Sequence, residues 1–344
     1  MPEAVDQPLR IVAAGLCCAL GYHLGAAACA LRANIDHFQE SEFLTQRDER
    51  LVVARLPDTD LWGQSRLARW LELAVADCLR HTPSLDTQEV PLVWLAPEPD
   101  RHGLTLSWWT EVFHAVVAKL GLTFHPRSGV MQLGRAGLAG ALEQVASLLE
   151  AEKRPAVMLV GVDSYLHAAT INHYLKSERL QVSGNSNGFI PGEAAAAVLL
   201  TRARPSDPGV KVIGYRQGHE AGRPDGSVPC RAQGLSDTIR AALASSQIAV
   251  ERLDFRVSDQ NGEAFFAKEA ANAFARVASK DSRQLRVVTL CDCLGEVGAA
   301  TGPAMLAYLS QLMPHADSPG RTALLHLAND DGLRSAVVVQ YQPT

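Results

Sequence analysis

The sequence predicts an α/β protein built from two similar halves, and three observations support that fold class. Apolar strand-like segments alternate with helical segments along the chain, which is typical of a mostly parallel sheet covered by helices. The turn-rich segment 204–209 (RPSDPG) interrupts this alternation, which then starts again. The chain has 344 residues, 47% hydrophobic and 20% charged, as expected for a soluble globular protein. We therefore expect a first half at 1–203 and a second half at 204–344.

Residues 184–200 (GNSNGFIPGEAAAAVLL) lie at the predicted centre of the fold. Gly184, Asn185, Asn187 and Gly188 tolerate tight or left-handed backbone geometry, which predicts a loop. Residues 194–200 are all small or branched and apolar, which is typical of a strand buried on both faces. Their small side chains also indicate that another segment packs closely against this strand.

Apolar periodicity predicts the other elements of the first half. In 66–79, for example, Leu67, Trp70, Leu71, Ala74 and Cys78 recur at helical spacing. The expected strands are 9–16, 51–56, 90–96, 129–133, 156–162 and 194–200, and the expected helices are 22–33, 66–79, 105–120, 134–150 and 165–175.

The second half repeats the alternation without a close sequence repeat, so the similarity of the halves rests on element order. Its expected strands are 210–215, 253–257, 285–290, 322–327 and 336–341, and its expected helices are 231–246, 264–278 and 297–312.

Composition excludes several classes of partner. A net charge of -5 gives no reason to expect nucleic acid, which prefers a basic surface. No apolar run approaches the length of a membrane span, and the first ten residues do not resemble a secretory signal. The seven scattered cysteines favour reduced, mostly buried thiols in a cytoplasmic protein. Cys291 and Cys293 offer too few ligands for a metal site, so we expect none, and no cofactor.

Several segments resemble β-ketoacyl synthases. Residues 183–200 are similar to the family pattern D-G-F-x-x-G-E-G-A, through Gly188, Phe189, Gly192 and Glu193. Residues 11–21, 134–149, 158–164 and 294–302 resemble further family segments, so the likeness covers nearly the whole chain. It implies the thiolase fold, with two halves in a five-layered α-β-α-β-α stack. We expect the four pattern residues to be structural, with the Glu193 carboxylate hydrogen-bonded inside the core.

The resemblance also locates the positions where the family carries its catalytic residues, and here different residues stand there. The family cysteine, at the start of a buried helix, falls on Gly134. Its two histidines fall on Asp259 and Glu296, and its lysine falls on Cys291. The two threonines that bind a pantetheine arm fall on Asn261 and Glu263, and the gate loop falls on 328–332.

These replacements predict a pseudoenzyme. Loss of an essential nucleophile costs roughly a million-fold in hydrolytic enzymes. A carboxylate in place of a proton-donating histidine opposes a developing oxyanion about 4 Å away by about 1 to 4 kcal/mol. We therefore expect no acyl condensation from this chain.

Two interpretations of the substituted positions remain open. Asp259, Glu263 and Glu296 could converge as acid and base, or hold a divalent cation. Alternatively, Gly134, Asp259, Asn261, Glu263 and Glu296 form a remnant pocket of hydrogen-bonded groups without catalytic use.

Three functional hypotheses follow. The first is a non-catalytic adaptor or co-chaperone, because the chain resembles synthase-like accessory proteins encoded beside effectors of the bacterial type VI secretion system. The second is a partner subunit of an active ketosynthase, similar to a chain-length factor. The third is a hydrolase that uses the carboxylates. Condensing enzymes pair through their first halves, so we expect a homodimer or heterodimer through that surface.

Overall fold

The computed structural model describes residues 7–58, 60–103, 106–150, 152–204 and 206–344. Within them, ten strands form one hydrogen-bonded sheet in the order β10-β9-β11-β12-β8-β1-β7-β6-β4-β5. The first half contributes β1 (Leu9–Cys18), β4 (Leu92–Ala96), β5 (Gly129–Gln132), β6 (Val157–Ser164) and β7 (Glu193–Arg202). The second contributes β8 (Gly209–His219), β9 (Phe255–Ser258), β10 (Arg286–Thr289), β11 (Thr322–Ala328) and β12 (Leu333–Gln342).

The two halves share one strand topology. In the first half β1 and β6 flank β7 antiparallel, and β4 runs parallel to both β6 and β5. In the second half β8 and β11 flank β12 antiparallel, and β9 runs parallel to both β11 and β10. The halves meet through the short pairing of β1 with β8 at Leu9–Val212 and Arg10–Lys211. The boundary expected at 203/204 falls between β7 and β8.

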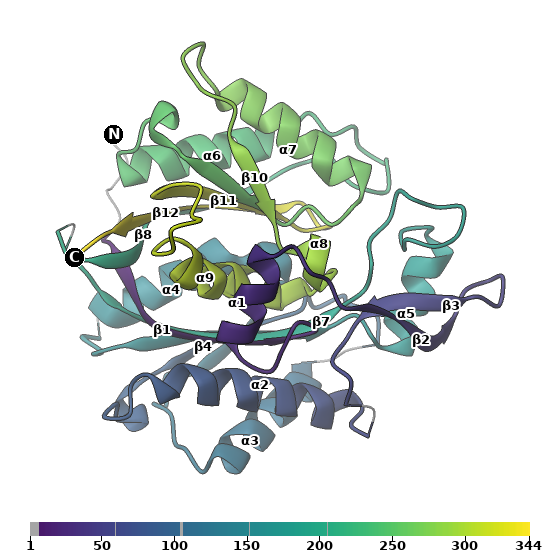
Figure 1. Ribbon diagram of the computed structural model, residues 1–344, viewed down its shortest axis with the longest axis horizontal. Helices are drawn as coiled ribbons and strands as arrows, with labels where there is room; N and C mark the ends of the chain where they lie inside the picture. Colours follow the sequence, from purple (N-terminus) through teal and green to yellow (C-terminus); the bar gives the residue numbers. More distant parts are fainter. Residues whose placement is uncertain (1–6, 59, 104–105, 151, 205) are drawn as a thin grey trace.

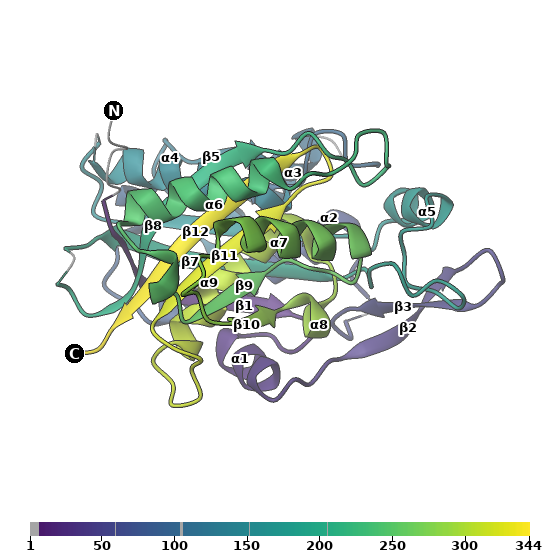
Figure 2. The same cartoon turned by 90° about the horizontal axis from the view of Figure 1, so that it is seen from above.

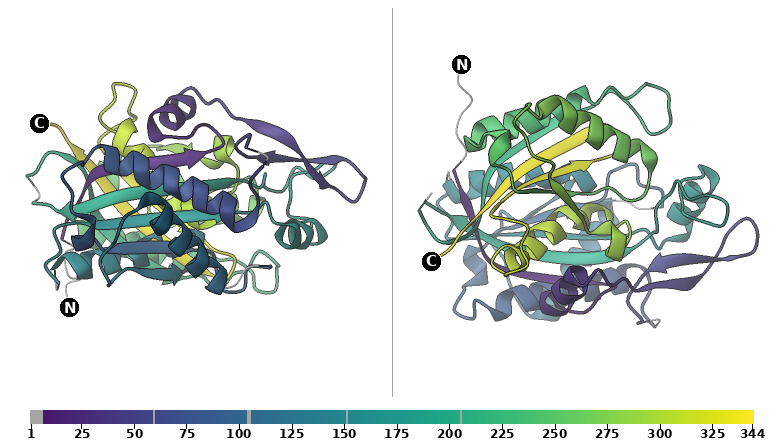
Figure 3. Two further views of the ribbon diagram at one scale, coloured as in Figure 1. Left: turned by 90° about the horizontal axis from the view of Figure 1, so that it is seen from below. Right: turned by 45° about the horizontal axis from the view of Figure 1, so that its top comes forward.

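Helices complete a five-layered stack, as the family resemblance implied (Figure 1). The inner layer contains α4 (Leu138–Glu150) and α9 (Thr301–Leu312), with α1 (Leu24–Arg32) and α8 (Cys291–Leu294) beside them. On one outer face lie α2 (Gly63–Arg80) and α3 (Leu106–Leu120) (Figure 3). On the other lie α6 (Gln233–Ser246) and α7 (Ala264–Val277), which cross above β11 and β12 (Figure 2). Among the described residues, no helix is both long and apolar enough to cross a membrane.

The small residues of β7 let the inner helices approach the sheet. Ala194, Ala195, Ala196 and Ala197 are all fully buried, and α9 packs against this strand. The expected strand 194–200 is therefore present and extends to Arg202.

One projecting hairpin was not predicted from the sequence. It consists of β2 (Phe38–Leu44) and β3 (Arg50–Ala54), and only β3 was predicted, as the strand 51–56. The hairpin extends to one side of the layers, near α5 (Ala168–Lys176) (Figure 1).

Candidate functional site

The candidate site begins where β5 ends. Gly134 has φ +59° and donates its backbone N–H to the Ala96 carbonyl at 3.0 Å, so the chain turns sharply after the strand. A short 3₁₀ turn, Arg135–Gly137, then leads into α4. A left-handed φ is easily adopted by glycine, which explains why this residue type fits the turn.

Arg135 directs its guanidinium into the interior between the two halves. The residue is 4% exposed. Its Nε lies 3.1 Å from Asp259 Oδ2 and donates to the Ala328 carbonyl at 2.7 Å, and its Nη1 pairs with Glu296. The guanidinium carbon also lies 4.6 Å from the centre of the Phe266 ring. A buried cation is thus matched by two carboxylates, a carbonyl and an aromatic face.

Backbone amides hold both carboxylates in place. Asp259 Oδ2 accepts from the Ala328 N–H at 2.7 Å, and Glu296 Oε1 accepts from the Gly298 N–H at 2.9 Å. Burial raises the pKa of Asp259 to about 6, while the Arg135 charge works against that rise.

Asn261 connects this pair to a second cluster nearer the surface. Its Nδ2 donates to Glu296 Oε2 at 2.9 Å and to Glu263 Oε2 at 3.1 Å. Glu263 accepts from Arg179 Nε at 2.7 Å, and Arg179 Nη1 pairs with Asp330 at 2.6 Å. Asp259, Glu263 and Glu296 therefore lie in one hydrogen-bonded chain, with two arginines among its members.

The gate-loop segment 328–332 is tied to the start of the helix. Asn329 Oδ1 accepts from the Ala136 N–H at 2.6 Å, and its Nδ2 donates to the Leu133 carbonyl at 2.8 Å. The segments that contain Gly134, Asp259 and Glu296 and the gate-loop segment are therefore connected to one another by side-chain contacts.

Cys291 is the thiol nearest to these groups. It is buried, and its Sγ lies 3.8 Å from the Asp259 carbonyl oxygen. Burial raises the pKa of the Cys291 thiol well above its usual range, and the Glu296 and Asp259 charges raise it further. A thiol with a raised pKa is a poor nucleophile, because the thiolate is the reactive form.

The four pattern residues of the central segment lie inside the fold. Glu193 is fully buried and accepts from Arg66 Nε at 2.8 Å. A Cβ at Gly192 would lie 2.4 Å from the Leu294 carbonyl oxygen, and one at Gly188 would lie 2.5 Å from the backbone of Leu180. Phe189 packs edge-on against Tyr165 and Tyr174 in a small aromatic cluster.

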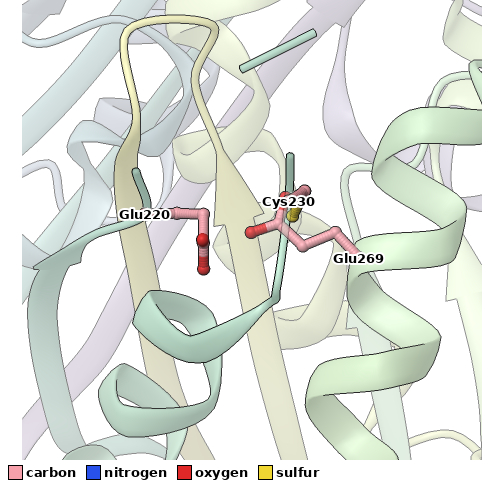
Figure 4. A group of neighbouring side chains, drawn as sticks. All are labelled: Glu220, Cys230 and Glu269. Carbon is pink, nitrogen blue, oxygen red and sulfur yellow. The ribbon is translucent and has the colours of Figure 1, made fainter. Parts of the chain in front are cut away.

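A separate group of possible ligands, Glu220, Cys230 and Glu269, lies between α6 and α7 (Figure 4). The Glu269 carboxylate is bound twice by Arg334, through Nε at 2.7 Å and Nη2 at 2.9 Å. Glu220 Oε2 accepts from the Gly234 N–H at 2.7 Å. Because donors from the chain already occupy these carboxylates, the group resembles a charge-paired structural cluster more than an open cation site.

The chemistry of the site follows from how its oxygens are occupied. A metal ion or a proton transfer would need carboxylate oxygens that are free to bind it. Here each of the three carboxylates pairs with an arginine, and Asn261 and backbone amides donate further hydrogen bonds to them. Neither Arg135 nor Arg179 was among the predicted site residues, although the charge of Arg135 inside the apolar helix start LGRAGLAGAL was a usable sign.

The five-layered arrangement matches the thiolase-like fold of ketosynthases. No family model matches the sequence, and no curated protein matches it. Among solved structures, the chain is similar to a β-ketoacyl synthase from Burkholderia phymatum STM815, with TM-score 0.73 and 13% identity over 98% of this chain and 100% of that chain.

Two further structures show the same similarity. The oxazolomycin ketosynthase domain OzmH KS7 of Streptomyces albus JA3453 gives TM-score 0.79 at 15% identity, covering 98% of this chain and 76% of that chain. The ketosynthase ApeO in complex with its chain length factor ApeC from Xenorhabdus doucetiae gives TM-score 0.71 at 14% identity, covering 98% of both chains. At these identities the similarity establishes the fold.

Proposed function

We propose that this chain is a non-catalytic protein of the thiolase fold that acts by binding another protein. The buried Arg135 guanidinium between Asp259 and Glu296 is the observation that carries the proposal. At the positions that the resemblance assigns to a nucleophile and two histidines stand Gly134 and two charge-paired carboxylates. These groups supply neither a thiolate nor a neutral proton donor for an oxyanion.

The geometry disfavours the hydrolase alternative. A catalytic carboxylate must reach water or substrate with a free oxygen. Asp259, Glu263 and Glu296 are each less than a tenth exposed, and each is paired with an arginine. Removing a proton from water by any of them would first require that an ion pair be broken in a buried environment.

The free edge of β5 supports a partner on the first half. Within the described residues, β5 pairs with β4 alone, so its other edge presents N–H and C=O groups that another strand can use. Several of the structural neighbours are complexes of a ketosynthase with a chain length factor, such as ApeO with ApeC. We therefore favour a ketosynthase as the partner, over a second copy of this chain or an effector complex.

Affinity purification of the tagged full chain from its native host, with mass spectrometry of the bound proteins, tests this proposal. We expect a ketosynthase to copurify. Recovery of a type VI secretion effector complex would instead support the adaptor hypothesis and would contradict a ketosynthase as the partner. A chain that runs as a monomer in gel filtration and recovers no partner would contradict protein binding altogether.

A substitution at the edge strand localises the interaction. A Cβ at Gly129 would meet no atom within 4 Å, so Gly129→Lys adds a charge to the β5 edge without a clash. We expect this variant to lose the partner, because charges on edge strands oppose strand pairing. Asn272→Lys, on an exposed position of α7, is the matched control and should keep the partner.

A further inference from the structure

A cavity of about 350 Å³ lies on the first half, and none of its lining residues belongs to the charged cluster around Arg135, Asp259 and Glu296. It is bounded by the β2–β3 hairpin, the start of α2, α3 and the segment that follows β6. The side chains that line it include Phe43, Arg55, Trp62, Trp108, Ser164 and His167. This volume lies within the range of small-molecule sites in proteins.

The apolar part of this lining is mainly aromatic. Phe43, Trp62 and Trp108 provide three rings, and Leu67 and Leu166 complete the large apolar side chains. Trp62 is 55% exposed, and covering a tryptophan ring from water is strongly favourable. An aromatic or other flat apolar body would cover these surfaces.

The polar part of the lining offers hydrogen-bond donors. Arg55 Nε is buried and has no partner among the described residues. His167 Nδ1 accepts from the Ala169 N–H at 3.3 Å, so in neutral His167 the proton is on Nε2. Ser164 Oγ accepts from the Leu166 N–H at 3.0 Å, and no described residue accepts its hydroxyl proton. Three donors therefore remain for a ligand that brings acceptors.

The other charged residues of the lining are already paired. Arg66 is bound by Glu193, and Asp58 Oδ2 accepts from the Tyr22 hydroxyl at 2.8 Å. Arg55 Nη1 pairs with Glu42, which does not line the cavity. Arg55 itself lines the cavity, so guanidinium N–H groups that Glu42 does not use can bind a second carboxylate.

We propose that this cavity binds a small aromatic monocarboxylic acid, with its ring among Phe43, Trp62 and Trp108 and its carboxylate on the Arg55 guanidinium. At roughly 30 Å³ for each water-sized group, the volume admits a ligand of about ten to twelve non-hydrogen atoms. 3-Phenylpropionate is such a probe. The site does not depend on the identity of the protein partner.

Isothermal titration calorimetry of the full chain with 3-phenylpropionate is the first test. We expect a dissociation constant on the order of a millimolar or tighter. The alcohol 3-phenylpropan-1-ol and the amine 3-phenylpropylamine should bind more weakly than the acid. Equal affinity for acid and alcohol, or no binding of the acid, would overturn the proposal.

Three variants test the roles of Arg55 and of the cavity itself. Arg55→Gln should weaken the acid about tenfold and leave the alcohol unchanged. Glu42→Gln breaks the same surface ion pair but keeps Arg55, so it should retain the acid and controls for effects of the lost pair on folding. Leu166→Trp should fill the cavity and abolish both ligands. Unchanged binding of the acid in either Arg55→Gln or Leu166→Trp would contradict the assignment.

Discussion

Replacement of Arg135 by methionine probes the buried charge cluster most sharply. Methionine keeps much of the side-chain volume and removes the guanidinium, which leaves Asp259 and Glu296 buried without their cation. Removing one partner of a buried ion pair costs about 3–5 kcal/mol. With 344 residues, at roughly 2.1 cal/mol/K each, that loss lowers the melting midpoint by about 4–7 °C.

The pH dependence of this loss gives a second, independent check. The pKa of Asp259 is about 6 in the folded protein, above its ordinary value of 3.8. The stability that this carboxyl contributes is therefore fully present below pH 3.8 and is lost as the pH rises through about 6. Without the Arg135 charge the folded pKa rises further. The destabilisation in Arg135→Met should consequently be larger at pH 8 than at pH 5.

Thermal denaturation followed by circular dichroism at both pH values measures these effects. Arg252→Met, at an exposed arginine, is the control and should have the same melting midpoint as the native chain. Adding Asp259→Asn and Glu296→Gln to Arg135→Met should restore part of the midpoint, because the cluster is then neutral. A midpoint in Arg135→Met within about 1 °C of the native chain at pH 8 would refute the reasoning, since a broken buried pair costs more.

Three further predictions use other residues. Gly134→Cys should lower stability by about 1–3 kcal/mol, because φ is +59° there and the new Cβ would collide with the Glu98 carboxyl, and thioester assays should detect no turnover. Iodoacetamide at pH 8 should label the exposed Cys29 and spare the buried Cys291, with peptide mapping as the readout; rapid labelling of Cys291 would contradict its raised pKa. Burial and the Arg256 charge lower the pKa of His326 to about 3, so the stability that the neutral imidazole contributes is lost as the pH falls below about 6.5. Between pH 7.5 and pH 4.5 that contribution falls by roughly 2–3 kcal/mol, so the free energy of unfolding of His326→Gln, from urea denaturation curves, should rise by about that amount relative to the native chain.

The sequence predicted the architecture well where apolar periodicity was strong. The alternation of strands and helices, the central strand after Glu193 and the helix that follows Gly134 are all present. These elements bury apolar faces, so their positions follow directly from the pattern of side chains.

The hairpin β2–β3 shows where that approach fails. Phe38–Leu44 reads FQESEFL, and only Ser41 in it is buried. A projecting strand with little buried surface has no strong apolar pattern, so its pairing with β3 could not be predicted.

The charged cluster was predicted in part. The resemblance singled out Asp259, Glu263 and Glu296 and left open whether they converge, and the structure places them in one hydrogen-bonded chain. The arginines were missed, because Arg179 lies 84 residues from its partner Glu263 and Arg135 lies 161 residues from Glu296. Pairings at such separations depend on tertiary structure and leave no local pattern.

The central claim is that the site holds a fixed ion-pair cluster and forms no covalent intermediate. Intact-mass spectrometry of the purified chain after incubation with an acyl thioester tests it most directly. We expect an unchanged mass. An added acyl group that maps by peptide analysis to Cys291, or to any residue bordering Arg135, would contradict it.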